Sequence, residues 1–186
     1  MNSRSLKNAY QIAITGIAIA FFQMPLACTK KVDDFSAQCV DLIAKKAYQE
    51  ALPNCDQAIL LGSNSAIDYT RRGFVYSQLG KYQDAIKDYN QALILQPDAI
   101  IVFNNRCFAY YRAGKYQQAI EDCNQVVHAK PDFAGAYGNR GRAKAALKNN
   151  QGAIKDYQLA AKLFLKQGNQ EGYQAVLKDL KQLQKP

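Results

Sequence analysis

The sequence predicts an all-α fold, a right-handed α-solenoid of about four helical hairpins followed by a C-terminal capping helix. The first observation is a gapless repeat, because residues 66–97, 100–131 and 134–165 align with a period of 34 residues. The second is the spacing of matching residues at steps of three and four within each unit, which is typical of helices. The third is the fixed placing of glycine and proline between these segments. Such a period indicates hairpins that bury their apolar faces only by stacking on one another.

Each repeat is expected to contain two helices. In residues 66–99, Tyr69 and Tyr76 lie on one face of the first helix, which ends at Gly80 because glycine adopts left-handed geometry at low cost. The stretch 83–95 repeats the helical pattern with alanines and a tyrosine on one face. Pro97 cannot continue that helix. The unit is therefore a helical hairpin with a tight turn in the middle.

Charged residues also recur with the period of 34. Asp98 and Asp132 precede the next helices and are expected to be their N-caps. Arginine and aspartate coincide in three units, at Arg72, Arg106 and Arg140 and at Asp88, Asp122 and Asp156. We interpret the row of aspartates as a feature of the helix surface, because one carboxylate per repeat forms no catalytic group.

The ends of the repeat array are less regular. Residues 32–65 form a weaker unit, and Pro53 falls inside its second helix, which must either begin late, near Glu50, or be kinked. Residues 170–184 have apolar side chains at helical spacing with lysines between them, which predicts a helix that covers the last seam. The alternative is a basic amphipathic helix that contacts an anionic membrane.

The residues at the repeated positions resemble the tetratricopeptide-repeat (TPR) family. In the clearest unit they are Tyr69, Gly73, Tyr76, Gly80-Lys81-Tyr82, Ala85, Tyr89, Ala92 and Pro97. The unit at 134–167 departs from the pattern, with Lys148 in place of the turn glycine and Leu165 in place of the closing proline. The resemblance implies TPR units at 32–65, 66–99, 100–133 and 134–167, followed by the capping helix at 170–184.

Residues 1–27 are expected to be a signal peptide. Arg4 and Lys7 precede an uncharged stretch with an apolar core at 12–22, which is the pattern of a secretory signal. This core is short for a membrane-spanning helix, which needs about 20 apolar residues. The stretch ends in Leu-Ala-Cys, which resembles the bacterial lipobox and implies a lipid on Cys28. We expect an exported bacterial protein, membrane-anchored or periplasmic; ordinary cleavage and an uncleaved anchor are the alternatives.

The other four cysteines occupy two repeat positions. Cys39 and Cys55 stand where a later unit has Cys107 and Cys123, and the two remaining units have glycine and tyrosine at these places. The two positions change together and should face each other across a hairpin, so we expect the disulfides Cys39–Cys55 and Cys107–Cys123 in an exported protein. The alternative is that cysteine is simply a small buried residue here. The spacing contains no CxxC motif, which argues against a metal site.

Composition and motifs argue against an enzyme. The chain contains no Gly-rich phosphate loop, nucleophile elbow or metal-ligand spacing, so we expect no catalytic residue and no cofactor. The formal net charge is +9, of which two positive charges lie in the signal peptide, so the exported part keeps +7. This excess suits an acidic peptide or an anionic membrane surface, and an exported protein is not expected to meet nucleic acid.

The TPR resemblance implies a non-catalytic protein-interaction scaffold whose first helices line a concave groove for an extended peptide. The corresponding groove positions are Arg71, Phe74, Asn104, Asn105, Phe108, Arg112, Asn139 and Arg142. The arginines would pair with carboxylates of a net-acidic partner. Of the Lys/Asn/Arg clamp that holds a peptide carboxylate in some relatives, only Asn105 has a counterpart. Two alternatives are that these arginines are solvated while the phenylalanines pack between repeats, and that the chain is an accessory subunit docking on an envelope or membrane complex through its convex face.

Overall fold

The computed structural model describes residues 26–184, which form nine helices and no strand. The chain divides into two compact units, Met1–Lys30 and Lys31–Pro186, and the description below concerns the second. Most of the predicted signal peptide lies outside the described residues, as does the side chain of Cys28. None of the helices in residues 26–184 is both long enough and apolar enough to cross a membrane.

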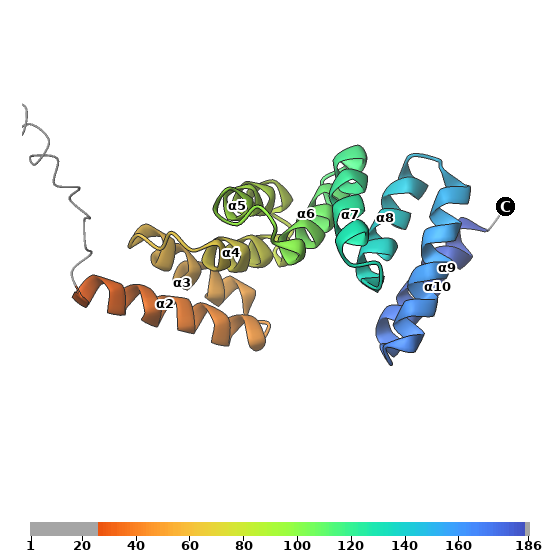
Figure 1. The fold of residues 1–186 in the computed structure, drawn as a ribbon. Coiled ribbons are helices and arrows are strands. Elements are labelled where there is room, and N and C mark those ends of the chain that lie inside the picture. Colours follow the sequence, from red (N-terminus) through yellow and green to blue (C-terminus); the bar gives the residue numbers. More distant parts are fainter. Residues whose placement is uncertain (1–25, 185–186) are drawn as a thin grey trace, which may run out of the picture. The chain divides into compact units, whose positions relative to one another are not determined.

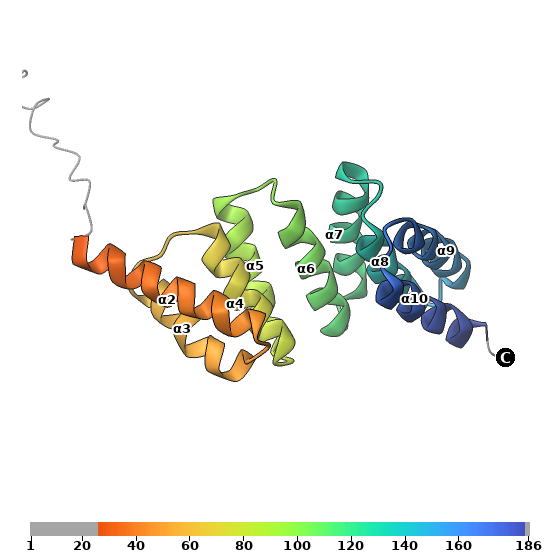
Figure 2. The same ribbon diagram turned by 90° about the horizontal axis from the view of Figure 1, so that it is seen from below.

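The helices follow one another along the chain in the order shown in Figure 1. Their bounds are α2 (Leu26–Ala44), α3 (Tyr48–Leu60), α4 (Ala66–Gln78), α5 (Tyr82–Leu95), α6 (Ile100–Arg112), α7 (Tyr116–Ala129), α8 (Ala134–Ala146), α9 (Asn150–Lys166) and α10 (Gln170–Leu183). Helices α4 and α5, α6 and α7, and α8 and α9 pair as hairpins, and the hairpins stack in sequence order (Figures 1 and 2). The predicted all-α solenoid is confirmed.

The first helices of the hairpins lie on the inner side of the stack. Helix α4 contacts α6, α6 contacts α8, and α8 contacts the capping helix α10. In the described part of the chain, the second helices α5, α7 and α9 do not contact one another. Because the first helices are closer together than the second, the stack curves with α4, α6, α8 and α10 along its concave face.

The turns inside the hairpins share one backbone conformation. Gly80 and Gly114 have φ angles of +75° and +76°, as predicted for turn glycines. The other two turns reach the same region with lysine, at Lys46 (φ 58°) and Lys148 (φ 64°). A side chain in this region costs roughly 1–2 kcal/mol, so the hairpin geometry is kept here at the expense of local strain.

Two predictions about helix ends are wrong. Asp98 and Asp132 do not cap the following helices, because Ala99 and Phe133 hold the N-cap positions and neither cap has a side-chain hydrogen bond. The turn after α5 continues through Asp98, since the backbone N–H of Ala99 donates to the carbonyl oxygen of Gln96 over 3.3 Å. The aspartates therefore stand one residue too early to cap a helix.

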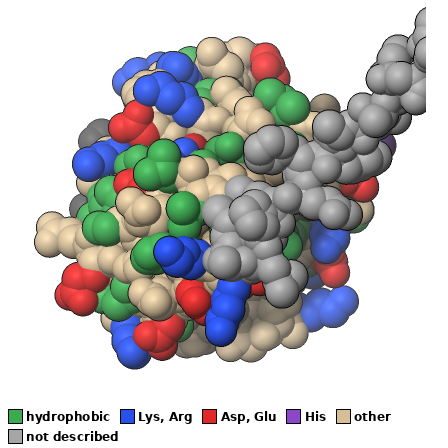
Figure 3. Space-filling model, turned by 90° about the vertical axis from the view of Figure 1, so that its left-hand side faces the viewer, with side chains coloured by type: hydrophobic (Ala, Val, Ile, Leu, Met, Phe, Trp, Pro, Cys, Tyr) green, Lys and Arg blue, Asp and Glu red, His purple; other side chains and the backbone are tan. Residues whose placement is uncertain are grey.

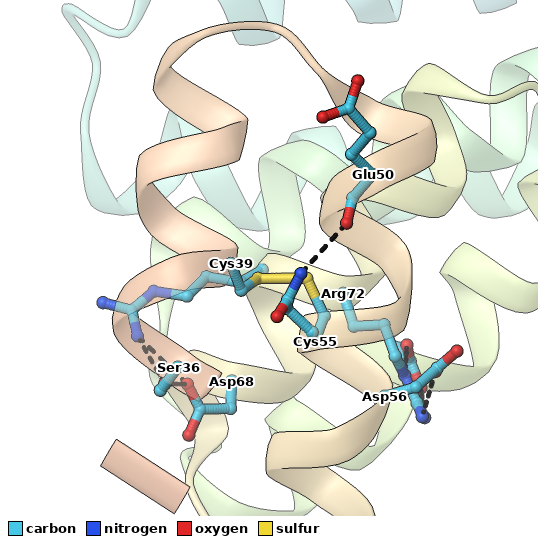
Figure 4. Close-up of a disulfide and its surroundings, with 10 residues drawn as sticks. Ser36, Cys39, Glu50, Cys55, Asp56, Asp68 and Arg72 are labelled. Carbon is cyan, nitrogen blue, oxygen red and sulfur yellow. Dashed lines mark hydrogen bonds and ion pairs between the residues drawn. A yellow bond between two sulfur atoms is a disulfide. The ribbon is translucent and has the colours of Figure 1, made fainter. Parts of the chain in front are cut away.

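The late start proposed for the second helix of the first unit is also wrong. Helix α3 begins at Tyr48 and continues through Pro53. Proline has no N–H to donate to the carbonyl oxygen four residues earlier, at Gln49. One residue further along, the side-chain amide of Asn54 donates to the carbonyl oxygen of Glu50 over 3.1 Å (Figure 4).

Two kinds of residue pair join the helices of a hairpin at the same place. In α4 and α8 a glycine lies against a tyrosine ring, and a Cβ atom on Gly73 would lie 2.8 Å from Tyr89 Cε1. In the first hairpin the sulfur atoms of Cys39 and Cys55 are 2.11 Å apart (Figure 4). In the third hairpin those of Cys107 and Cys123 are 1.98 Å apart. The four cysteines thus lie in two pairs at disulfide distance, each within one hairpin.

The row of aspartates is buried, and its interpretation as a surface feature is wrong. Asp88, Asp122 and Asp156 are 5%, 6% and 4% exposed. In the second hairpin, Arg72 Nε and Nη2 donate to Asp88 over 2.8 and 2.7 Å, and these hydrogen bonds raise the pKa of Arg72. The third nitrogen, Nη1, donates to Asp56 of the preceding hairpin over 3.0 Å (Figure 4).

The same bridge occurs in the next two hairpins. Arg106 binds Asp122 with two nitrogens and Asn90 with the third, and Arg140 binds Asp156 and Asn124 in the same way. Each arginine therefore joins the two helices of its own hairpin and connects them to the hairpin before. A buried carboxylate without a cation would lower the free energy of unfolding. Each bridge therefore favours the one arrangement in which the arginine reaches both its own aspartate and the preceding hairpin.

Candidate functional site

The predicted groove residues all lie on first helices. Arg71 and Phe74 belong to α4, Asn104, Asn105, Phe108 and Arg112 to α6, and Asn139 and Arg142 to α8. The structure thus places them along three neighbouring helices of the concave side. Their individual surroundings differ, however, and these differences decide which of them can meet a ligand.

Arg71 is already paired within the chain. Its Nη1 lies 3.0 Å from Asp68 Oδ1 and 3.2 Å from Ser36 Oγ. Asp68 is 8% exposed and also accepts hydrogen bonds from the hydroxyls of Ser36 and Ser63. This polar cluster, of which Figure 4 labels Ser36 and Asp68, ties α2 to α4 and neutralises the charge of Arg71.

Arg142 is paired as well. Its Nε donates to Asp179 Oδ2 in α10 over 2.7 Å, and its Nη1 donates to Asn139 Oδ1 over 3.2 Å. Asn139 itself is buried, at 8% exposure. Arg142 therefore attaches the capping helix to α8, and Asn139 hydrogen-bonds the same guanidinium from within α8. Two of the three arginines expected to bind an acidic partner are engaged with carboxylates of the chain itself.

Arg112 is the exception among the three. It is exposed at the C-terminal end of α6, and it makes no ion pair within the described part of the chain. Its guanidinium carbon lies 4.8 Å from the centre of the Tyr82 ring and 5.6 Å from that of Phe108. Aromatic faces attract cations and restrict their position. The guanidinium is therefore held in place while its charge remains available.

The predicted phenylalanines pack against tyrosines that the sequence analysis did not assign to the groove. Phe74 packs edge-on against Tyr48, with ring centres 6.0 Å apart. The rings of Phe108 and Tyr82 both contact the guanidinium of Arg112. Tyr48 and Tyr82 are the first residues of the second helices α3 and α5. Tyr48 and Tyr82 are 34 residues apart, so the repeat itself could have predicted that both tyrosines lie beside the groove phenylalanines.

The two asparagines of α6 differ from each other. Asn104 Oδ1 is buried and has no hydrogen-bond partner among the described residues. Asn105 is partly exposed on the same helix. A buried acceptor without a partner costs about 1–3 kcal/mol, and because this oxygen is covered by the chain itself, a ligand on the surface would not reach it.

A hollow of about 430 Å³ opens between the N-terminal ends of α4 and α6. Its walls are mainly apolar, formed by Ala66, Ile67, Thr70, Ala99, Ile100, Ile101 and Val102, with Arg71, Gln96, Asp98 and Lys130 also lining it. Ile67 and Ile101 are 57% and 52% exposed, which is unusual for large aliphatic side chains. They occupy the same repeat position, a coincidence from which the sequence could have predicted this apolar site. We call it the α4–α6 hollow.

In residues 26–184, no three His, Cys, Asp or Glu side chains lie close enough together to hold a metal ion. On the side of the molecule seen in Figure 3, basic, acidic and hydrophobic side chains are intermixed. The α4–α6 hollow and the ring-bound Arg112 are thus the features from which a binding function can be built.

Two family models match this chain, and both describe the tetratricopeptide repeat. One covers residues 66–99 and the other residues 109–170. Among curated protein sequences, none is similar enough to this chain to count as a match.

Several solved structures resemble it. The first TPR domain of human RPAP3 is 30% identical, with a TM-score of 0.57 over 66% of this chain and 94% of that domain. The first TPR of Spaghetti (RPAP3), bound to the HSP90 peptide SRMEEVD, is 28% identical, with a TM-score of 0.56 over 66% of this chain and 95% of that one. YrrB, a TPR protein, is 18% identical with a TM-score of 0.69 over 79% of this chain and 74% of that one, and shares the fold.

Proposed function

We propose that this chain, which belongs to the tetratricopeptide-repeat family, is a protein-interaction scaffold that holds an extended, net-acidic segment of a partner protein in its concave groove. The observation that carries this proposal is the pairing of an exposed apolar hollow with an available cation on the first helices α4 and α6. Apolar contacts supply affinity, whereas a placed charge supplies specificity.

Relatives with bound peptides support the choice of ligand. The first TPR of Spaghetti (RPAP3) is bound to an HSP90 peptide, SRMEEVD, and the second TPR domain of human RPAP3, 26% identical to this chain, to an HSP70 peptide, SGPTIEEVD. Both peptides combine carboxylates with apolar side chains.

The convex face provides a specific alternative. Leu60 and Ile94 occupy the same repeat position on the second helices α3 and α5 and are 75% and 71% exposed. These side chains would suit docking of the convex face on a larger complex. The two faces can be separated by substitutions of the same kind, Ile101→Glu in the hollow and Ile94→Glu on α5, because both residues are already more than half exposed.

The test is capture of partners from membranes by the full chain, quantified by mass spectrometry. If the groove is the binding face, Ile101→Glu loses the captured partners and Ile94→Glu retains them, with unchanged helicity by circular dichroism in both variants. The reverse result would assign binding to the convex face and refute the groove.

Export and lipid anchoring are a further part of this proposal. They rest on the basic-then-apolar pattern of residues 1–27 and on the Leu-Ala-Cys that ends at Cys28. Cys28→Ser should release the protein from membranes or leave it unprocessed. Unchanged mass and unchanged partitioning into detergent would instead favour ordinary cleavage or an uncleaved anchor.

A further inference from the structure

We infer that Arg112 receives a carboxylate of the bound segment, while the α4–α6 hollow takes an aliphatic side chain of the same segment about five residues away. This inference rests on the proposed function and specifies its recognition element. The ligand it describes is an extended protein segment that carries one large aliphatic residue and one acidic residue at a set spacing.

The assignment of Arg112 follows from what the three groove arginines already bind. Arg71 faces Asp68 at 3.0 Å and Arg142 faces Asp179 at 2.7 Å, so a ligand carboxylate would have to compete with a partner that is already in place. Arg112 has no such competitor among the described residues, and the Tyr82 and Phe108 rings hold its guanidinium. Because the side chain is already restrained, less rotamer freedom is lost when an anion binds.

The α4–α6 hollow fits an aliphatic rather than an acidic side chain. Ile67 and Ile101 are largely exposed at its edge, and the alkyl parts of Ala66, Thr70 and Val102 line it. Covering these side chains removes apolar surface from water, which favours an aliphatic occupant. The charged residues that line it are Asp98, Lys130 and Arg71, and the charge of Arg71 is already paired with Asp68, so the hollow offers little net charge to an anion.

The spacing follows from helix geometry. Ile101 and Arg112 are eleven residues apart on α6, so they are separated by about 16 Å along the helix axis at 1.5 Å per residue. An extended chain spans about 3.3 Å per residue, and about five residues therefore bridge the two sites. A segment lying along α6 would also pass over Asn104 and Phe108, which lie between these ends.

The experiment measures binding of fluorescein-labelled 12-residue peptides to the full chain, purified in mild detergent, by fluorescence anisotropy. The test peptide has one leucine and one glutamate five residues later in a Ser/Thr/Gly background. Three comparison peptides replace glutamate by glutamine, replace leucine by serine, or keep the composition and move the glutamate to nine residues. The protein variants are Arg112→Gln and, as a control of equal charge change, Lys155→Gln on the exposed side of α9.

We expect the test peptide to bind best and each comparison peptide to bind about tenfold more weakly, because one charge-assisted hydrogen bond or one buried aliphatic side chain is worth roughly that factor. Arg112→Gln should weaken the glutamate peptide by a similar factor and leave the glutamine peptide unchanged, whereas Lys155→Gln should change neither. This non-additive pattern identifies a direct contact between the guanidinium and the carboxylate.

Three results would overturn the inference. They are equal weakening by Arg112→Gln and Lys155→Gln, equal binding of the five- and nine-residue spacings, and no binding of any peptide at concentrations up to about 1 mM. None of these results refutes the proposed function by itself, because partner capture that depends on Ile101 would still show a groove ligand of different chemistry. Loss of that dependence would refute both.

Discussion

The glycine–tyrosine and cysteine–cysteine pairs should be interchangeable, because both fill the space between the two helices of a hairpin at the same repeat positions. The perturbation is Cys107→Gly together with Cys123→Tyr, which rebuilds the third hairpin on the pattern of Gly141 and Tyr157 in the fourth. In the fourth hairpin a Cβ atom at Gly141 would lie 2.7 Å from Tyr157 Cε1, so the ring fits only beside a residue without a side chain. Both substitutions are therefore needed at once.

The expected magnitudes come from two independent terms. The Cys107–Cys123 disulfide closes a loop with a sequence separation of 16, which is worth about 3 kcal/mol in the chain-entropy model. A buried tyrosine removes about 150–250 Å² from water, or roughly 4–6 kcal/mol as an upper bound, and a helical glycine costs about 1 kcal/mol. The exchanged hairpin should therefore be within about 1–2 kcal/mol of the oxidised parent.

The assay is denaturant unfolding followed by circular dichroism, with and without reductant. Cys107→Ser with Cys123→Ser should lose about 3 kcal/mol, which corresponds to roughly 6–12 °C in melting temperature for a chain of this size. The Gly/Tyr variant should recover most of that loss and should be insensitive to reduction of this hairpin. Cys123→Tyr alone should be less stable than the Ser/Ser control, because the ring would collide with the Cβ atom of Cys107.

Equal stability of the Gly/Tyr and Ser/Ser variants would refute the reasoning, since it would mean that the tyrosine ring does not enter the space between the helices. A second contrary result would be free thiols at all four cysteines in the exported protein. That finding would return Cys39, Cys55, Cys107 and Cys123 to the role of small buried residues.

Three further outcomes follow from the fold. Arg106→Leu leaves Asp122 buried without its cation and should cost about 3–5 kcal/mol in denaturant unfolding, whereas adding Asp122→Leu should restore most of that stability; equal losses in both variants would contradict a buried ion pair. Lys148→Gly removes a side chain from a turn at φ 64° and should raise stability by about 1 kcal/mol, and a decrease would show that the turn is not strained. Pro53→Ala restores a helical N–H in α3 and should raise stability by up to about 3 kcal/mol, with an increase in helical circular dichroism; no gain would show that the helix accommodates proline without loss.

Much of the fold could be predicted because the same helical spacing and the same turn residues recur in several units of 34 residues. Glycine at position 80 and proline at position 97 mark the ends of helices by local geometry alone, and the structure has helix ends at both places. The N-caps failed at Asp98 and Asp132 because a turn signal does not say which of its residues begins the next helix. Pro53 is the opposite case: this residue favours a helix break, but α3 continues through it because the helix is packed against its neighbours.

The buried arginine–aspartate bridges could have been predicted from the sequence, but the sequence analysis did not recognise them. Each pair is separated by 16 residues, the same separation as the cysteines in Cys39–Cys55 and Cys107–Cys123. A spacing that brings two cysteines together across a hairpin also brings together the neighbouring pair of charges. Missing from the sequence was the third contact, from each arginine to the preceding hairpin, because that partner is reached only by stacking.

By itself, the sequence determined the repeat, the helical hairpins and the pairing of equivalent positions across each hairpin, because these follow from periodicity and local backbone geometry. Only the tertiary structure decided that, of the arginines predicted to line the groove, Arg142 is paired with a carboxylate of the chain, whereas Arg112 has no such pair among the described residues. Arg71 pairs with Asp68 one turn earlier on the same helix, a spacing visible in the sequence. Asp179, by contrast, reaches Arg142 from the capping helix, 37 residues away, and the Tyr82 ring reaches Arg112 from α5. Whether a charge is neutralised depends on its neighbours in space, and those neighbours are set by how the hairpins and the capping helix stack.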